Sequence, residues 1–145
     1  MEERMGQYYL VVNIDKEQYL NPHSCGDGLK LLEFGCSAKG TLTGLAILLA
    51  DGNCRGGGDL RSTNPIIGTW AGDRIVVTGD YADEGRFVKD PKRNLYEIAR
   101  QGFQDVSRQP LRAMADDPYL AQSMKQSQTW HDEQSCSVFD FAMRE

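Results

Sequence analysis

The sequence has few of the features that membrane, exported or nucleic-acid-binding proteins need. No apolar run approaches the roughly 18 residues of a membrane span, and residues 1–5 form a short charged lead with no apolar stretch after it. Sixteen basic residues stand against 21 acidic ones, for a formal net charge of −5. A broad basic face for duplex nucleic acid is therefore not expected. We expect a cytoplasmic protein that contacts neither membranes nor duplex nucleic acid.

Cysteine pairs with metal-binding or redox spacing are also missing. The chain has four cysteines and no CxxC pair, the cysteines being Cys25, Cys36, Cys54 and Cys136. Without an export signal we expect reduced thiols. A zinc site could be assembled from His23, Cys25, Cys36 and Cys54, or from His131 and Cys136, because imidazole and thiolate are zinc ligands. The spacing does not favour either set, so we predict no metal site, and no motif identifies another cofactor.

What is present fits one domain, residues 1–145. Alternating apolar residues predict a strand from Tyr8 to Ile14, and Gln18 to Leu20 predicts a short return strand. Two β-rich runs, Ile66–Trp70 and Arg74–Gly79, flank Ala71-Gly72-Asp73 and predict a hairpin. The sheet is therefore expected to be small and antiparallel or mixed.

Helices are predicted between and after these strands. Leu42, Leu45, Ala46 and Leu49 follow helical spacing, and with Ile47 and Leu48 they predict a central helix that is almost wholly buried, capped by Thr41 and ended by Gly52. We expect its stripe to pack beside four strand residues: Leu10, Val12, Ile75 and Val77.

Two Asp-Pro steps mark the starts of C-terminal helices. Asp90-Pro91 and Asp117-Pro118 each place an N-cap residue before a proline at the first helical position. Residues 126–145 are mostly polar and are expected either to dock or to fray. The whole pattern predicts an α+β fold, with the sheet packed on the central helix and with C-terminal helices.

The most unusual segment is the glycine-rich stretch at residues 51–59, DGNCRGGGD. Three consecutive glycines, Gly56, Gly57 and Gly58, would let backbone amides approach a phosphate or carboxylate, with Arg55 as a bidentate partner and Asp59 and Trp70 as further contacts. The segment lacks the Gly-Lys-Ser/Thr of a phosphate loop and the terminal Glu of a calcium loop. It is either a small-anion site or a connector.

Loop acids are the only candidates for catalysis. Asp27, Asp59, Asp73 and Asp80 each lie next to or close to glycine, and they could converge as metal ligands or as an acid/base pair, with His23 as a general base. Aspartate beside glycine is also ordinary turn chemistry. Trp70 is either a stacking wall or a core anchor.

Four short segments carry a resemblance. They are GQYY at residues 6–9, VNIDK at 12–16, GDGLKLLEFG at 26–35 and WAGDR at 70–74. Together they resemble a group of small prokaryotic or phage-type proteins with no known activity, over about residues 6–85. The resemblance implies a microbial or phage-like cytosolic setting and brings no cofactor or catalytic residue.

Two functions stay open on the sequence. The first is a non-catalytic binding module that contacts another protein or a small anionic ligand through residues 51–59, in the manner of an accessory or inhibitor protein. The alternative is a metal-assisted hydrolase or transferase that uses the loop aspartates. Carboxylates gathered in a pocket would favour the enzyme, whereas dispersed acids beside an exposed apolar patch would favour the module.

Overall fold

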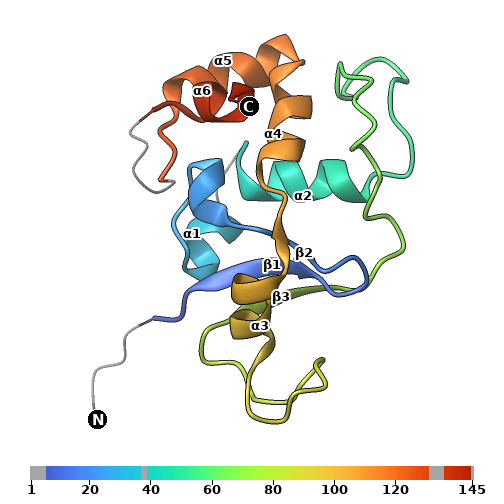
Figure 1. Cartoon of the computed structure of the whole chain (residues 1–145). Coiled ribbons are helices and arrows are strands. Elements are labelled where there is room, and N and C mark those ends of the chain that lie inside the picture. The colour runs from blue at the N-terminus through green and yellow to red at the C-terminus, as the bar shows by residue number, and fades with distance from the viewer. Residues whose placement is uncertain (1–5, 37–38, 131–135, 145) are drawn as a thin grey trace.

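The computed structural model of the chain describes residues 6–36, 39–130 and 136–144. These residues form a four-stranded mixed sheet of order β3-β1-β2-β4, six α-helices and one short 3-10 helix, so the predicted α+β class is confirmed (Figure 1). The strands are β1 (Tyr9–Asn13), β2 (Gln18–Leu20), β3 (Ile75–Gly79) and β4 (Gln104–Asp105). The helices are η1 (Pro22–Cys25), α1 (Leu31–Gly35), α2 (Thr41–Leu49), α3 (Leu95–Gly102), α4 (Arg108–Ala115), α5 (Pro118–Gln126) and α6 (Val138–Met143).

The sheet is built around β1, which pairs antiparallel with both β2 and β3. Its register sets Val11 opposite Leu20 on one side and opposite Val77 on the other. The two-residue strand β4 adds to β2 in the parallel direction and makes the sheet mixed. The strands predicted at 8–14, 18–20 and 74–79 are therefore confirmed, with slightly shorter bounds for the first and third.

The hairpin predicted around Ala71-Gly72-Asp73 is wrong, because residues 65–72 form consecutive turns and not a strand. The amides of Gly68 and Trp70 donate to the carbonyls of Ile47 and Leu48, at 3.0 and 2.8 Å. Carbonyls in the last turn of a helix have no partner within it. The 65–72 segment therefore caps the end of α2, and β3 pairs with β1 instead.

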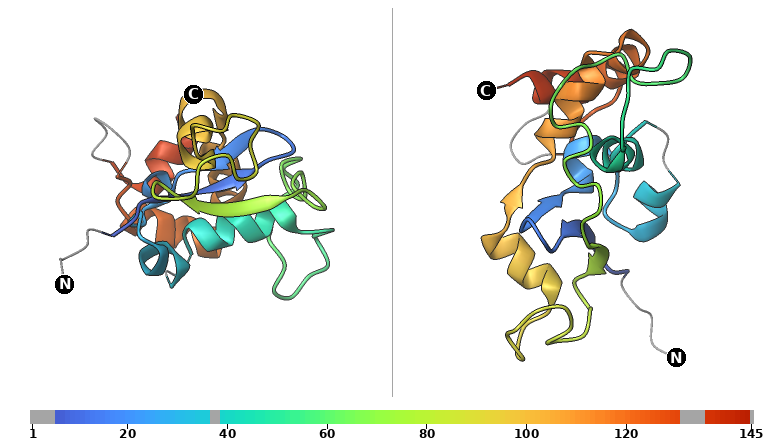
Figure 2. Two further views of the ribbon diagram at one scale, coloured as in Figure 1. Left: turned by 90° about the horizontal axis from the view of Figure 1, so that it is seen from below. Right: turned by 90° about the vertical axis from the view of Figure 1, so that its right-hand side faces the viewer.

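Helices cover the sheet on both faces (Figure 2). On one face Leu10 and Val12 pack with Leu95 and Ala99 of α3. On the other face a second cluster contains Val11, Leu20, Phe34, Leu48, Trp70 and Val106. A third core lies among the C-terminal helices, between α4, α5, α6 and one side of α2. Alternate residues of β1 therefore enter different cores, as the alternating pattern of the sequence requires.

The buried face of α2 is not the predicted one. Leu42 and Leu49 are 41% and 37% exposed, Ala46 is exposed as well, and Leu45 is only half-buried. The buried positions are instead Thr41, Gly44, Ile47 and Leu48. Ile47 packs in the core of the C-terminal helices, and Leu48 packs in the core beneath the sheet. The buried face of α2 is therefore set by its contacts with these two cores. Val77 is likewise 42% exposed and not in the core.

The helix starts show one success and one error for the Asp-Pro signal. Asp117 is the N-cap of α5, as predicted, and accepts a hydrogen bond from the Tyr119 amide at 3.0 Å. The helix after Asp90-Pro91 begins later, at Leu95, with Asn94 as its N-cap. Asp90 instead accepts hydrogen bonds from the Lys92 amide and the Arg93 guanidinium, which hold it in a separate turn.

Residues 136–144 dock onto the helical core. Val138, Phe141 and Ala142 of α6 are buried, and Arg108 and Arg112 of α4 donate to the carbonyls of Phe141 and Ala142.

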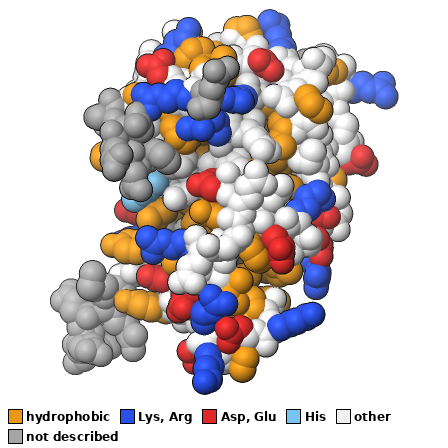
Figure 3. Space-filling view, viewed as in Figure 1, with side chains coloured by type: hydrophobic (Ala, Val, Ile, Leu, Met, Phe, Trp, Pro, Cys, Tyr) orange, Lys and Arg blue, Asp and Glu red, His pale blue; other side chains and the backbone are white. Residues whose placement is uncertain are grey.

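Among the described residues no helix combines the length and apolar character needed to cross a membrane. Charges of both signs are interspersed over the face seen in Figure 3, without a large patch of one sign.

Candidate binding groove

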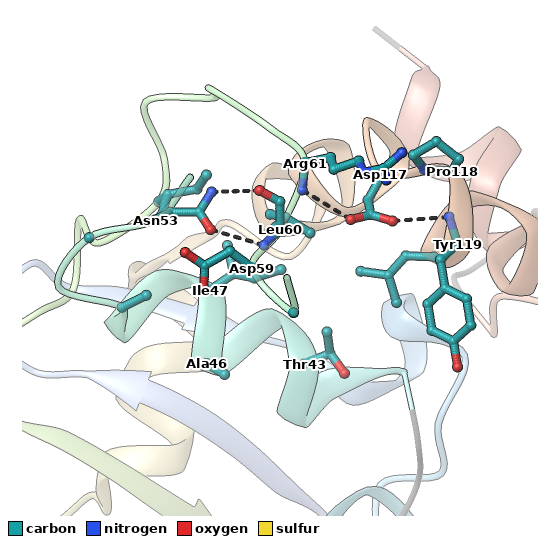
Figure 4. A pocket seen from close by; sticks show the side chains of 15 residues that line it. Thr43, Ala46, Ile47, Asn53, Asp59, Leu60, Arg61, Asp117, Pro118 and Tyr119 are labelled. Atoms are coloured by element: carbon teal, nitrogen blue, oxygen red, sulfur yellow. Dashed lines mark hydrogen bonds between the residues drawn. The ribbon is translucent and has the colours of Figure 1, made fainter. Parts of the chain in front are cut away.

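A hollow lies between α2, the 51–61 loop and the start of α5 (Figure 4). Its volume is about 780 Å³, within the range of small-molecule and peptide sites. We call it the α2–α5 groove. It is lined by Thr43, Ala46, Ile47, Ala50, Gly52, Asn53, Gly58, Asp59, Leu60, Arg61, Ile67, Asp117, Pro118, Tyr119 and Leu120.

One side chain holds the loop that forms the wall of the groove. The Asn53 amide nitrogen donates to the carbonyls of Leu60 and Ser62 at 2.8 and 3.1 Å, and its oxygen accepts from the Leu60 amide at 2.9 Å. The two arms of the 51–61 loop are thereby clamped across their base. The loop keeps its shape although most of its residues are exposed.

Asp117 joins that loop to α5. One oxygen of its carboxylate accepts from the Arg61 amide at 3.0 Å, while the other accepts from the Tyr119 amide at the helix start. The bond from the Arg61 amide is the largest cause of a lowered pKa for Asp117, and the Tyr119 and Leu120 amides act in the same direction. The carboxylate is therefore ionised at neutral pH with its charge directed into backbone donors.

The floor of the groove is apolar and its rim is polar. Ile47, Ile67 and Leu120 belong to the helical core cluster or pack against it, and they close the bottom. Arg61 is exposed at the rim, and its guanidinium forms no hydrogen bond or ion pair with another described residue. Tyr119 is 69% exposed. The Lys39 ammonium lies over the Tyr119 ring, 4.3 Å from its centroid. The groove thus offers apolar contact beside the positive charge of Arg61, with Lys39 held at Tyr119.

The apolar surface of the groove continues along α2. Ala46 lines the groove, and Leu42 and Leu49 extend the same stripe at four residues before it and three residues after it; all three are exposed. These residues are the greater part of the stripe that the sequence predicted to be buried. A helix with an apolar face in water next to a hollow is a typical interaction surface.

The backbone of the glycine-rich loop is shaped by two of its three consecutive glycines and by a bond within the loop. Gly56 and Gly58 need glycine, because their φ values are +85° and +96°. Gly57 has no atom within 4 Å of the place that a Cβ would take, so packing does not require glycine there. The Asp59 carboxylate itself accepts from the Arg55 amide at 2.8 Å. A shallow hollow of about 300 Å³ remains along residues 54–61, with Arg55 exposed beside it.

The loop aspartates are dispersed and hold the fold. Asp27 is buried and accepts from the amide and hydroxyl of Thr41 at 2.7 and 2.6 Å, so it anchors the start of α2. Asp73 accepts from Lys16 and from Asn13, and the Lys16 bond is the largest cause of its lowered pKa. These are turn and cap roles, as Asp-Gly chemistry provides.

Asp80 accepts from the Tyr8 amide at 3.0 Å and lies at the opposite end of β3 from Asp73. A five-residue strand separates them by roughly 17 Å. Asp59 accepts from the Arg55 amide within the 51–61 loop. Of the two alternatives left open by the sequence, the four aspartates therefore follow ordinary turn chemistry in separate turns. In the part of the chain that the structure describes, no three His, Cys, Asp or Glu side chains gather as a metal site would require.

The structure places His23 and Cys25 in η1 and the other three cysteines in separate parts of the fold. The His23 carbonyl accepts from the Trp130 amide at 2.8 Å, which ties η1 to the segment before α6. All four cysteines are free, and burial raises the pKa of the Cys25 thiol to about 12. His131, proposed as a partner of Cys136, lies outside the described residues.

Trp70 is fully buried, and its indole nitrogen donates to the Gln18 side chain at 2.7 Å. Of the two interpretations offered for Trp70, the core anchor is therefore correct, and its ring is not accessible for stacking on a ligand. The predicted segment 51–59 contributes Gly52, Asn53, Gly58 and Asp59 to the lining of the groove, whereas sequence reasoning missed Arg61 and Tyr119. Outside that segment only Asp117 carried a signal, and that signal indicated a helix cap.

Comparisons of the chain with protein-family models, with curated proteins and with solved structures gave no match.

Proposed function

We propose that the protein is a non-catalytic binding module, and that its α2–α5 groove receives a segment of a partner protein. The observation that carries the proposal is the exposed apolar stripe of α2, Leu42, Ala46 and Leu49, beside a groove with an apolar floor. The dispersal of the loop aspartates over separate turns adds support, because an acid/base or metal reaction needs carboxylates held together.

The unpaired guanidinium of Arg61 specifies the chemistry of that segment. A carboxylate is the group that pairs best with an arginine, through two parallel hydrogen bonds. The neighbouring carboxylate of Asp117 forms no ion pair with Arg61 and accepts a backbone amide at each oxygen, although the charge of Arg61 contributes to its lowered pKa. The ligand is thus a peptide segment with large apolar side chains and an adjacent Asp or Glu.

Selection from a displayed random-peptide library on the full chain tests this proposal. We expect enrichment of peptides that combine large apolar residues with an acidic one. Ala46→Lys should weaken their binding by charging the apolar stripe, and Arg61→Gln should weaken it about tenfold or more by removing the cation. Neither change removes the backbone bonds of the loop, so both variants should fold.

Arg86→Gln is the matched control, because Arg86 is also exposed but lines a different hollow. It should bind the selected peptides as well as the wild type does. The proposal fails if no peptide class is enriched, or if all three variants bind the selected peptides equally.

A small anion is the second candidate. The hollow of about 300 Å³ along residues 54–61, with the exposed Arg55 beside it, favours this possibility. The Asp59 carboxylate opposes it, because that group already accepts the Arg55 amide. Phosphate and citrate should then raise the Tm of the wild type and not of Arg55→Gln; equal shifts would exclude this site.

The proposal places the module in the cytoplasm, where the free thiols of all four cysteines would stay reduced. An accessory or inhibitor protein in a microbial or phage setting is the role that fits a small module of this kind.

A further inference from the structure

A second surface, separate from the α2–α5 groove, lies along β3. This strand is at the edge of the sheet and pairs only with β1. Its sequence from Ile75 to Gly79 is IVVTG, which has no charged residue and no proline. Natural edge strands are usually protected by such residues, because an open edge can pair with another strand.

Hydrogen bonds at the two ends of β3 show which backbone groups face β1. The Ile14 amide donates to the Arg74 carbonyl at 3.0 Å, and the Asp80 amide donates to the Tyr8 carbonyl at 2.9 Å. In an antiparallel pair every second residue bonds to the neighbouring strand. The even-numbered residues from 74 to 80 therefore face β1, and the odd-numbered residues face outward.

The outward backbone groups belong to Ile75, Val77 and Gly79. Among the described residues no hydrogen bond uses the amide or the carbonyl of Ile75 or of Val77, whereas the Gly79 carbonyl accepts from Ala82. Val77 is 42% exposed. A hollow of about 430 Å³ beside residues 76–79 is bounded on its other side by residues between 81 and 87 and by Leu95 of α3. The edge is open to an incoming strand at its middle.

We propose that a second copy of this chain pairs with this edge, antiparallel and about a two-fold axis at Val77. Val77 then lies opposite the partner's Val77, and Ile75 opposite the partner's Gly79. The outward backbone groups of Ile75 and Val77 are available to the partner strand, whereas the Gly79 carbonyl already accepts from the Ala82 amide. The ladder is therefore centred on Val77, and no bond to β1 has to shift. The two sheets become one continuous sheet with an isologous interface.

The charges that flank β3 favour this occupant and this direction. Arg74 precedes the strand and Asp80 follows it, so antiparallel copies place Arg74 opposite the partner's Asp80 at both ends. A parallel copy would place like charges together. Arg74 uses only Nε and Nη2 for its bonds to Asp15, and one Asp80 oxygen accepts from Tyr8. Both groups keep capacity for a further bond.

Sedimentation velocity on the full chain over a wide concentration range tests the pairing. We expect the wild type to shift from monomer to dimer as concentration rises. Val77→Lys should stay monomeric at the concentrations where the wild type is dimeric, because it sets two ammonium groups opposite each other at the axis. Leu42→Lys is the matched control, since Leu42 is 41% exposed on a different surface, and it should dimerise as the wild type does.

Hydrogen exchange on the wild-type protein gives a second readout that needs no variant. The Val77 amide should become protected only at concentrations where the dimer forms, whereas the Val76 and Thr78 amides, bonded to β1, should be protected throughout. A wild type that stays monomeric would overturn the proposal and leave this edge to a strand of a different protein. A dimer that Leu42→Lys abolishes, or one in which the Val77 amide exchanges freely, would also overturn it.

Discussion

Truncating Leu48 tests the face that α2 buries. Leu48 is fully buried beneath the sheet among large side chains that include Phe34 and Trp70. Each carbon that Leu48→Ala removes costs about 0.8 kcal/mol of transfer free energy, and the cavity left among rigid rings adds to that. We expect the free energy of unfolding to fall by about 3–5 kcal/mol. Leu42→Ala, at a position 41% exposed, should cost about 1 kcal/mol or less.

Urea unfolding followed by tryptophan fluorescence and by circular dichroism measures both values. Trp70 is a local probe, because it packs in the same cluster as Leu48. The two variants should share the wild-type dependence on urea concentration and differ in midpoint. If Leu42→Ala costs as much as Leu48→Ala, or if Leu48→Ala costs less than about 1 kcal/mol, then our assignment of the buried face is wrong.

Three further outcomes can be measured on single variants or on the wild type. Asp117→Ala should lower the free energy of unfolding by about 1 kcal/mol at pH 7; because the folded pKa of Asp117 lies below its ordinary 3.8, the difference from wild type should shrink as pH falls through that lowered value. Trp70→Phe should cost about 1–3 kcal/mol in urea unfolding, since it removes the bond to Gln18 and leaves a gap. Mass spectrometry of timed alkylation should find the exposed Cys36 and Cys54 modified first and the buried Cys25 last; equal rates at all four cysteines would contradict the burial.

The strands β1, β2 and β3 could be predicted because their signals are local, whereas the two-residue strand β4 was missed. The alternation through β1 and the β-branched run of β3 each specify extended backbone whatever they pack against. The Asp117-Pro118 step specified the start of α5 for the same reason. By contrast, α2 is apolar on nearly every side, so its sequence is compatible with several buried faces. Which of these faces is buried depends on where α4 and the sheet lie in the fold, and the sequence of α2 alone does not indicate that.

The groove was beyond sequence reasoning for a related reason. Its walls come from segments more than 50 residues apart, joined by the bond from the Arg61 amide to Asp117. The cap that Asp117 forms at the start of α5 can be read from neighbouring residues. The bond that its carboxylate accepts from the Arg61 amide cannot, because Arg61 is far away in the sequence. With the loop aspartates, sequence reasoning proposed a site where there are structural residues. Asp27 and Asp73 lie beside glycine, and an aspartate beside glycine looks the same in sequence whether it holds a turn or acts as a catalytic acid.

The parallel pairing of β2 with β4 has a consequence for synthesis on the ribosome. Tyr19 has its partner at Asp105, late in the chain. At about 5–20 residues per second, translation separates the two by roughly 4–17 s. During that interval the nascent β1–β2 hairpin has no β4 to cover its edge, so we expect chaperones that bind extended segments to find β2 there. A chain stalled before residue 104 would keep that edge open.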